Sequence, residues 1–151
     1  AAGKAWPRCS SASEQGKDMT TTPHNLSQQP WREQDGRVVL LASRIGMREG
    51  LHFPPLPATS PLAADSQLVE LTSTPVLYSY TIVHSNPKAG KAPMPLVLAD
   101  FPEGLRVFGR LDAPAGRRPV IGEPLKVCVM QADGAPIYAF QPVQDNAGSA
   151  A

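Results

Sequence analysis

The sequence has 151 residues, of which 42% are hydrophobic and 18% charged, and its formal net charge is +1. This size fits one domain with terminal segments, and no apolar run approaches the roughly 20 residues of a membrane span. The small net charge argues against nucleic-acid binding, which needs clustered Lys and Arg. With 17 prolines and 12 glycines, the chain favours strands and turns over long helices.

The N-terminal segment, residues 1–35, is rich in Ser, Thr, Gln and Pro and has almost no periodic apolar signal. We therefore expect a disordered arm, or an arm that lies on a partner. Residues 1–18 lack the apolar core of a secretory signal, and we expect them to be a tag, a linker or an over-extended gene start before Met19. Trp31 is the exception in this arm, and we expect it to anchor the arm onto its own domain.

The next segment, residues 36–67, joins a short apolar run to a proline-rich loop. The run Gly36–Ser43 suits a strand or one short helical turn. The loop contains Gly46, Gly50 and four prolines but no cysteine, and its X-Pro steps favour extended backbone. We expect coil with at most one hairpin, although such small modules usually need a disulfide or a metal.

From Leu68 the sequence shows the alternation of β-strands. Residues 68–85 are rich in Val, Thr, Tyr and Ile and predict one long strand with a bend or bulge at Pro75. Further strands are predicted at 94–101, 105–112, 125–132 and 135–143, and Asp133–Gly134 is a strong hairpin signal. Five strands in residues 68–143 indicate a mainly β protein with a partly open OB-fold barrel, with a sandwich fragment as the alternative. Residues 144–151 are expected to be a disordered tail.

The two cysteines, Cys9 and Cys128, lie far apart in the sequence. We expect no disulfide between them, and we interpret Cys128 as a small core residue because its neighbours are apolar. Unpaired cysteines are typical of a reducing compartment, so the expected localisation is cytoplasmic.

No catalytic or metal-binding constellation stands out in the sequence. His24, His52 and His84 lie in three separate regions, whereas a metal site needs several ligands at short spacing. No Gly-x-Ser-x-Gly nucleophile elbow is present. His84, at the end of the predicted long strand, is expected to bond water or backbone, with the rim of a pocket as the alternative. We expect no activity from the chain alone, no bound metal and no bound cofactor.

Two basic loops offer a weak signal for an anionic ligand. Lys88 and Lys91 flank Gly90, and Gly116–Arg118 forms a second basic loop. Lys acts as a point charge for phosphates, and Gly lets backbone N–H groups approach them. A single-stranded nucleic-acid-binding OB module is an alternative function, because Tyr78 and Tyr80 are expected to present two rings on one strand face.

Four phrases in order, LYSYTIVH, PLVLADFPEGLRVFGRL, IGEPLKVCV and IYAFQPV, resemble the OB-fold, acyl-CoA-associated proteins that carry an N-terminal rubredoxin-like zinc ribbon. The resemblance covers Asp35–Val143. It implies a non-catalytic subunit that helps to bind acyl-CoA and docks on a thiolase, an acyl-CoA hydratase, an aldolase acting on steroid side chains, or an acyltransferase making polyketide-like products. No membrane partner is expected. On this resemblance, the candidate ligand-binding residues are Tyr78, Tyr80 and His84 at the barrel face, and Lys88, Lys91 and Arg110 for the CoA phosphates.

The sequence departs from that family in the proline-rich loop. Ile45 and Arg48 stand about where the family has its first Cys-x-x-Cys pair, and Thr59 and Leu62 about where it has the second. Ile and Leu carry no donor atom and Arg is a cation, so a thiolate zinc site is excluded. We therefore expect a degenerate, metal-free ribbon that packs on the barrel or on a partner. The residues expected to make this packing are Leu51, Phe53, Leu56 and Leu62.

Overall fold

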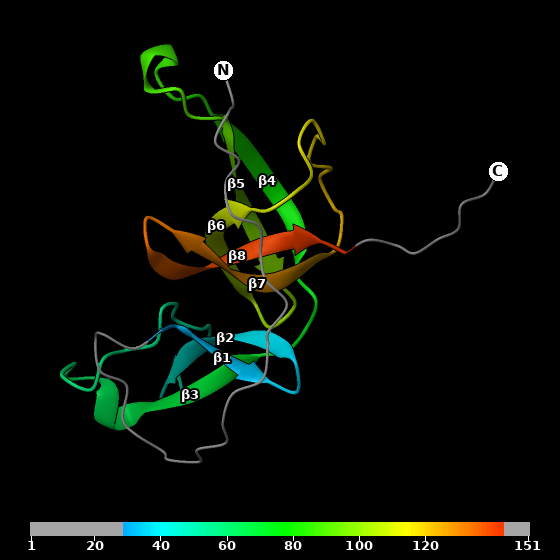
Figure 1. Cartoon of the computed structure of the whole chain (residues 1–151). Helices are drawn as coiled ribbons and strands as arrows, with labels where there is room; N and C mark the ends of the chain where they lie inside the picture. Colours follow the sequence, from blue (N-terminus) through cyan, green and yellow to red (C-terminus); the bar gives the residue numbers. More distant parts are fainter. Residues whose placement is uncertain (1–28, 144–151) are drawn as a thin grey trace.

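The computed structural model describes residues 29–143, and this part of the chain is almost entirely β-structure (Figure 1). Its strands form two sheets, one of three strands in the order β1-β2-β3 and one of five in the order β4-β5-β6-β8-β7. The strands are β1 (Trp31–Gln34), β2 (Arg37–Ile45), β3 (Ser66–Leu71), β4 (Val76–Val83), β5 (Met94–Phe101), β6 (Leu105–Leu111), β7 (Leu125–Ala132) and β8 (Ala135–Pro142). The short 3-10 turns are η1 (Ala63–Asp65) and η2 (Pro87–Ala89).

The five-stranded sheet curls into a partly open barrel. Strands β4, β5 and β6 pair antiparallel in succession, β8 joins β6 in parallel, and β7 pairs antiparallel with β8. The edge strands meet at one end only, where the Leu77 N–H donates to the carbonyl of Glu123 and the Gly122 N–H donates to the carbonyl of Leu77. The mainly β prediction is confirmed, and this strand order is that of an OB-fold barrel.

Strand β3 belongs to the other sheet, which corrects the prediction of one long strand from Leu68. It pairs antiparallel with β2, from Leu71 opposite Leu40 to Ser66 opposite Ile45. The apolar alternation therefore continues across a change of sheet. Pro75, which has no N–H to donate to a ladder, marks that change rather than a bend within one strand.

Strand β1 lies within the segment that was predicted to be a disordered arm, so that prediction is wrong for residues 31–34. Trp31 pairs with Leu40 of β2. The hairpin turns at Asp35 and Gly36, where φ is +51° and +73°, the left-handed pair that a two-residue type I′ turn needs. The predicted Asp133–Gly134 hairpin turns in the same way, with φ of +51° and +81°. The rest of the predicted arm and the predicted tail, residues 1–28 and 144–151, lie outside the described residues.

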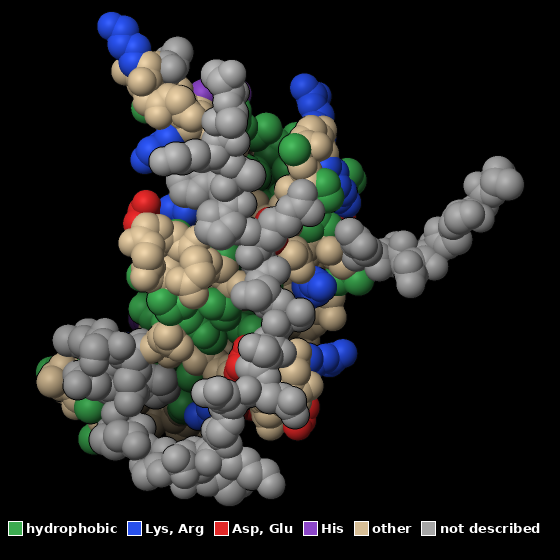
Figure 2. Space-filling view, viewed as in Figure 1, with side chains coloured by type: hydrophobic (Ala, Val, Ile, Leu, Met, Phe, Trp, Pro, Cys, Tyr) green, Lys and Arg blue, Asp and Glu red, His purple; other side chains and the backbone are tan. Residues whose placement is uncertain are grey.

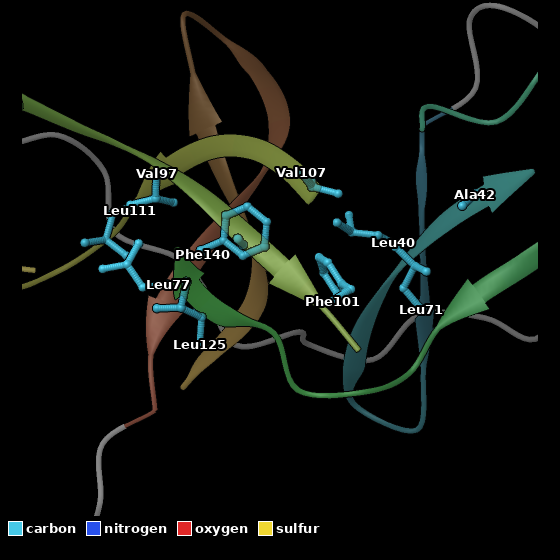
Figure 3. Packing of buried hydrophobic residues seen from close by; sticks show 11 residues of the cluster. Leu40, Ala42, Leu71, Leu77, Val97, Phe101, Val107, Leu111, Leu125 and Phe140 are labelled. Atoms are coloured by element: carbon cyan, nitrogen blue, oxygen red, sulfur yellow. The ribbon is translucent and has the colours of Figure 1, made fainter. Parts of the chain in front are cut away.

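One hydrophobic core joins the two sheets (Figure 3). Its buried members are Leu40, Ala42 and Leu71 from the three-stranded sheet and Leu77, Val97, Ala99, Phe101, Val107, Leu111, Leu125 and Phe140 from the barrel. Trp31, Leu51 and Phe53 pack against this core, as predicted. The Tyr138 ring of β8 lies edge-on to two of them, with its centroid 5.4 Å from that of Phe53 and 6.4 Å from that of Trp31. Apolar packing therefore holds the three-stranded sheet on the barrel.

The loop between β2 and β3 is tied to the sheet through Ser43, which is only 3% exposed. The backbone of Ser43 exchanges two hydrogen bonds with that of His52, each 2.8 Å long. The Ser43 hydroxyl accepts a third, at 2.9 Å, from the Leu56 N–H. The N–H, the carbonyl and the hydroxyl of this buried residue therefore all form hydrogen bonds that close the proline-rich loop.

The two positions expected to replace the first ligand pair form a tight turn, in which the Arg48 N–H donates to the Ile45 carbonyl at 3.0 Å. Ile45 is buried, but Leu62, at a position of the second pair, is 41% exposed. The expectation that Leu62 packs on the barrel is therefore wrong, and contact with a partner remains as its predicted alternative. The Gly46 N–H donates to the Asp65 carbonyl at 2.7 Å, which joins the turn after β2 to the 3-10 turn η1.

Cys128 is disulfide-bonded, so the expectation of an unpaired thiol is wrong. The only other cysteine of the sequence, Cys9, lies outside the described residues. Cys128 packs with Met130 and Ala139 in a small cluster separate from the main core. The argument from unpaired cysteines to a reducing compartment therefore loses its basis. Within residues 29–143, no helix has the length and apolar character needed to cross a membrane.

Candidate functional site

A β-bulge at Tyr78 decides which side chains of β4 face outward. The register of β4 against β5 shifts between Leu77 and Ser79. Tyr80 consequently lies opposite the buried Val97 and packs against the core, whereas Tyr78 is half exposed. The prediction that the two tyrosines share a strand face is wrong, because an extra residue in a strand exchanges the faces of the residues that follow it.

Tyr78, Arg106 and Asp100 form an ordered unit on the outside of the barrel. The guanidinium carbon of Arg106 lies 3.3 Å from the centroid of the Tyr78 ring. Arg106 also donates from Nε and Nη2 to the two carboxylate oxygens of Asp100, the second bond being 2.9 Å long. These hydrogen bonds hold the pKa of Asp100 below its ordinary value and raise that of Arg106. The combination of a stacked ring and a two-pronged hydrogen bond requires Arg, because Lys has no planar fork.

The outward side chains of β4, β5 and β6 make a mostly apolar surface, which we call the outer face. Its residues are Val76, Tyr78, Ser79, Thr81, Val83, Met94, Leu96, Leu98, Asp100, Arg106, Phe108 and Arg110. Leu98 of the middle strand lies between Ser79 and Phe108 in register. Phe108 is 55% exposed and Tyr78 50%. Large apolar side chains that gather on one exposed face mark a contact surface more often than scattered ones do.

Phe108 is held outward by its neighbours on the inner side of the barrel. Where β6 and β8 separate, the Tyr138 hydroxyl donates to the Phe108 carbonyl at 2.7 Å, and burial raises the pKa of that hydroxyl. The next residue, Gly109, faces inward, and a Cβ there would stand 2.7 Å from the Phe140 ring. The missing side chain of Gly109 therefore lets the two inner rings pack against β6 and fixes the strand that carries Phe108.

The remaining predicted site residues lie beyond the barrel. His84, Lys88 and Lys91 are exposed on the β4–β5 loop, which projects away from the three-stranded sheet (Figure 1). In this loop Asn86 Oδ1 accepts a hydrogen bond from the Lys88 N–H at 3.0 Å, and Gly90 adopts φ +59°. Arg110 lies on the outer face, where it pairs in register with Leu96.

The second basic loop projects at the same end but does not meet the first. Arg117 donates two hydrogen bonds to Glu123, which lower the pKa of that carboxyl. Figure 2 shows Lys and Arg side chains at the tips of two separate projections at this end of the molecule. The structure therefore brings Tyr78 and Arg110 onto one face, places Lys88 and Lys91 at its end, and leaves Tyr80 partly buried against the core.

Sequence reasoning did not single out Phe108 or the pairing of Asp100 with Arg106. The alternation in Leu105–Leu111 was the available signal, because it sends Arg106, Phe108 and Arg110 to the face opposite the core. Among residues 29–143 no three His, Cys, Asp or Glu side chains come together as metal ligands would. The exposed apolar side chains of the outer face suit contact with another molecule.

Two grooves flank the start of β7 on another side of the barrel. The larger, of about 610 Å³, lies between the β1–β2 turn, the Thr72–Pro75 linker and β7. The smaller, of about 430 Å³, lies under the β6–β7 loop. Lys126, Gln141 and Val143 line both.

Residues 68–130 match the family model of the C-terminal OB-fold domain of ChsH2. This part of the chain has an OB fold and is similar in sequence to that domain. The match begins within β3 and ends within β7, so it includes the whole outer face. A search of curated proteins finds no match. Among solved structures, a chain described as "Ltp2-ChsH2(DUF35) aldolase" is 28% identical with a TM-score of 0.55, over 69% of this chain and 84% of that chain.

Proposed function

We propose that this chain is a non-catalytic subunit of an acyl-CoA-processing enzyme, and that its ChsH2-type domain docks on an aldolase-, thiolase- or hydratase-type catalytic partner. The observation that carries this proposal is the 28% identity, over 69% of the chain, to a structure described as an Ltp2-ChsH2 aldolase. An aldolase-type partner is the form that this similarity favours. The match covers 84% of that chain, so the similarity extends over most of its length.

The side chains of residues 29–143 agree with a supporting role. The ordered groups on the surface are used in internal contacts: Arg106 with Asp100, Arg117 with Glu123, and Arg32 with Glu70. A catalytic acid, base or nucleophile needs a partner within hydrogen-bond reach and an open place for substrate. On this proposal the reacting groups come from the partner, and the chain contributes binding surface.

The ligand that the complex would share is an acyl-CoA. Its phosphates suit Lys88 and Lys91, which form no ion pair among the described residues and act as point charges. Their place on a projecting loop would let them reach a ligand held mainly by the catalytic subunit. No metal and no permanently bound cofactor belong to this proposal.

The test is co-expression of the tagged chain with an aldolase-type polypeptide encoded in the same genome. We expect the two to copurify in a fixed ratio and the complex to cleave an aldol CoA thioester. The polypeptide alone serves as the control, and we expect it to be insoluble or at least ten-fold less active. Full activity of the polypeptide alone, with no complex on size-exclusion chromatography, would contradict the proposed function.

A further inference from the structure

The outer face has the composition of a protein–protein contact. Four large hydrophobic side chains on it are exposed by 40% or more, namely Val76, Tyr78, Val83 and Phe108. Binding energy in interfaces concentrates on a few aromatic and Arg residues near the centre of a contact. Here Phe108 and the Tyr78–Arg106 stack lie on neighbouring rows of one sheet.

These side chains are already ordered before any partner binds. Arg106 is fixed by Asp100 on one side and by the Tyr78 ring on another, and the Phe108 backbone is fixed by Tyr138. Ordering long side chains costs part of the binding free energy, so a face that is ordered beforehand loses less on association. Because Arg106 and Asp100 form an ion pair, docking would bury the two charges together and would not leave either of them unpaired.

We infer that the outer face, centred on Phe108 and the Tyr78–Arg106–Asp100 unit, is the surface on which the catalytic subunit docks. This inference rests on the proposed function. It assigns the contact to the barrel rather than to the proline-rich loop, where the fully exposed Met47 stands on a turn and not on a sheet.

The charges around the face decide the kind of partner. Arg106 and Asp100 compensate each other, so the remaining basic groups at the β4–β5 end are Arg110 on the face and Lys88 and Lys91 on the loop. A complementary surface has an apolar centre and carboxylates facing this loop. A second copy of this chain would bring the same lysines, and its Asp100 is already engaged by Arg106. A catalytic subunit with an acidic rim therefore fits better than self-association.

The experiment measures binding of the chain to the aldolase-type polypeptide that reconstitutes activity, by isothermal titration calorimetry. Phe108→Ala is expected to weaken binding at least ten-fold, because a central aromatic is lost. Met47→Ala is the matched control, since it removes an equally apolar and more exposed side chain elsewhere, and it should stay within two-fold of wild type. Both variants should keep the wild-type melting midpoint, because neither side chain belongs to the core.

Two further variants sharpen the assignment. Arg106→Lys keeps the charge but loses the fork and the stack, and we expect binding to weaken three- to ten-fold. Neutralising both loop charges, Lys88→Gln with Lys91→Gln, should slow association and reduce its salt dependence while changing dissociation little.

The outcomes separate the two proposals. Wild-type affinity in Phe108→Ala would overturn the outer face as the docking surface while leaving the proposed function intact. A free chain that elutes as a dimer, and becomes a monomer with Phe108→Ala, would assign the face to a second copy and overturn the catalytic subunit as its occupant. If the wild-type chain does not bind the polypeptide at all, the proposed function fails and this inference fails with it.

Discussion

The three-stranded sheet and the barrel differ in how much of a core each can build. The barrel supplies eight of the buried side chains of the main cluster, whereas the three-stranded sheet supplies Leu40, Ala42 and Leu71. A sheet of three strands is stable only when one of its faces is covered. In this molecule the barrel covers it, and Figure 2 shows hydrophobic side chains gathered where the two parts meet. The small sheet therefore takes stability from its packing on the barrel.

The largest effect that follows from this comparison is expected for Phe140→Ala. Phe140 is fully buried in the barrel, and truncating such a ring costs about 3–5 kcal/mol. Because the core is shared, both sheets should unfold together. Urea titrations followed by circular dichroism and by Trp31 fluorescence, with Trp6 replaced by Phe, should give midpoints that fall equally. A Trp31 transition that stays in place while the dichroism shifts would show two independent units.

Gly109→Ala is expected to have the next largest effect. The added methyl would stand 2.7 Å from Phe140 Cε2 and 3.1 Å from Tyr138 Cε2, and overpacking of this kind costs about 1–3 kcal/mol. Tyr138 also touches Trp31 and Phe53, so the strain should reach the small sheet. The control is the double variant Gly109→Ala with Phe140→Leu, whose total cost should be less than the sum of the two singles. Strict additivity would contradict the clash.

A smaller effect distinguishes the two Asp-Gly turns. Gly36 and Gly134 have φ of +73° and +81° and open space around them, so Ala at either position adds backbone strain alone, about 1 kcal/mol. If both hairpins belong to one cooperative unit, the two substitutions should lower the unfolding midpoint by similar amounts. An effect of Gly134→Ala without any effect of Gly36→Ala would show that the β1–β2 hairpin opens on its own.

The same two turns show what the sequence could reveal. The apolar alternation around Asp133–Gly134 was clear, and β7 and β8 appear where it predicted them. Around Asp35–Gly36 the first strand has only Trp31 as a large apolar residue, so composition suggested an arm although the turn signal was the same. The dipeptide alone was sufficient evidence there, because few other pairs adopt two positive φ angles in succession.

Other features depend on contacts that no short pattern carries. The alternation of β3 indicates that one face of the strand is buried, but it does not indicate the sheet to which the strand belongs. That is decided by the pairing of β3 with β2. The bulge at Tyr78 moves two tyrosines to opposite faces without any change in residue type. The site is therefore less predictable than the fold, because a one-residue shift exchanges the two faces of a strand.

The smallest expected effect concerns metal removal. If packing and the hydrogen bonds of Ser43 hold the proline-rich loop, a chelator has nothing to remove, and EDTA should leave the melting midpoint unchanged. The matched positive control is Phe53→Ala, which keeps every hydrogen bond of Ser43 but removes the ring packed on Tyr138 and should lower the midpoint in both buffers alike. Metal analysis that finds about one zinc per chain, or a midpoint that falls with EDTA, would contradict a metal-free ribbon. The comparison between the two sheets would then change, because a structural zinc supplies folding free energy directly and the small sheet would no longer depend on the barrel alone.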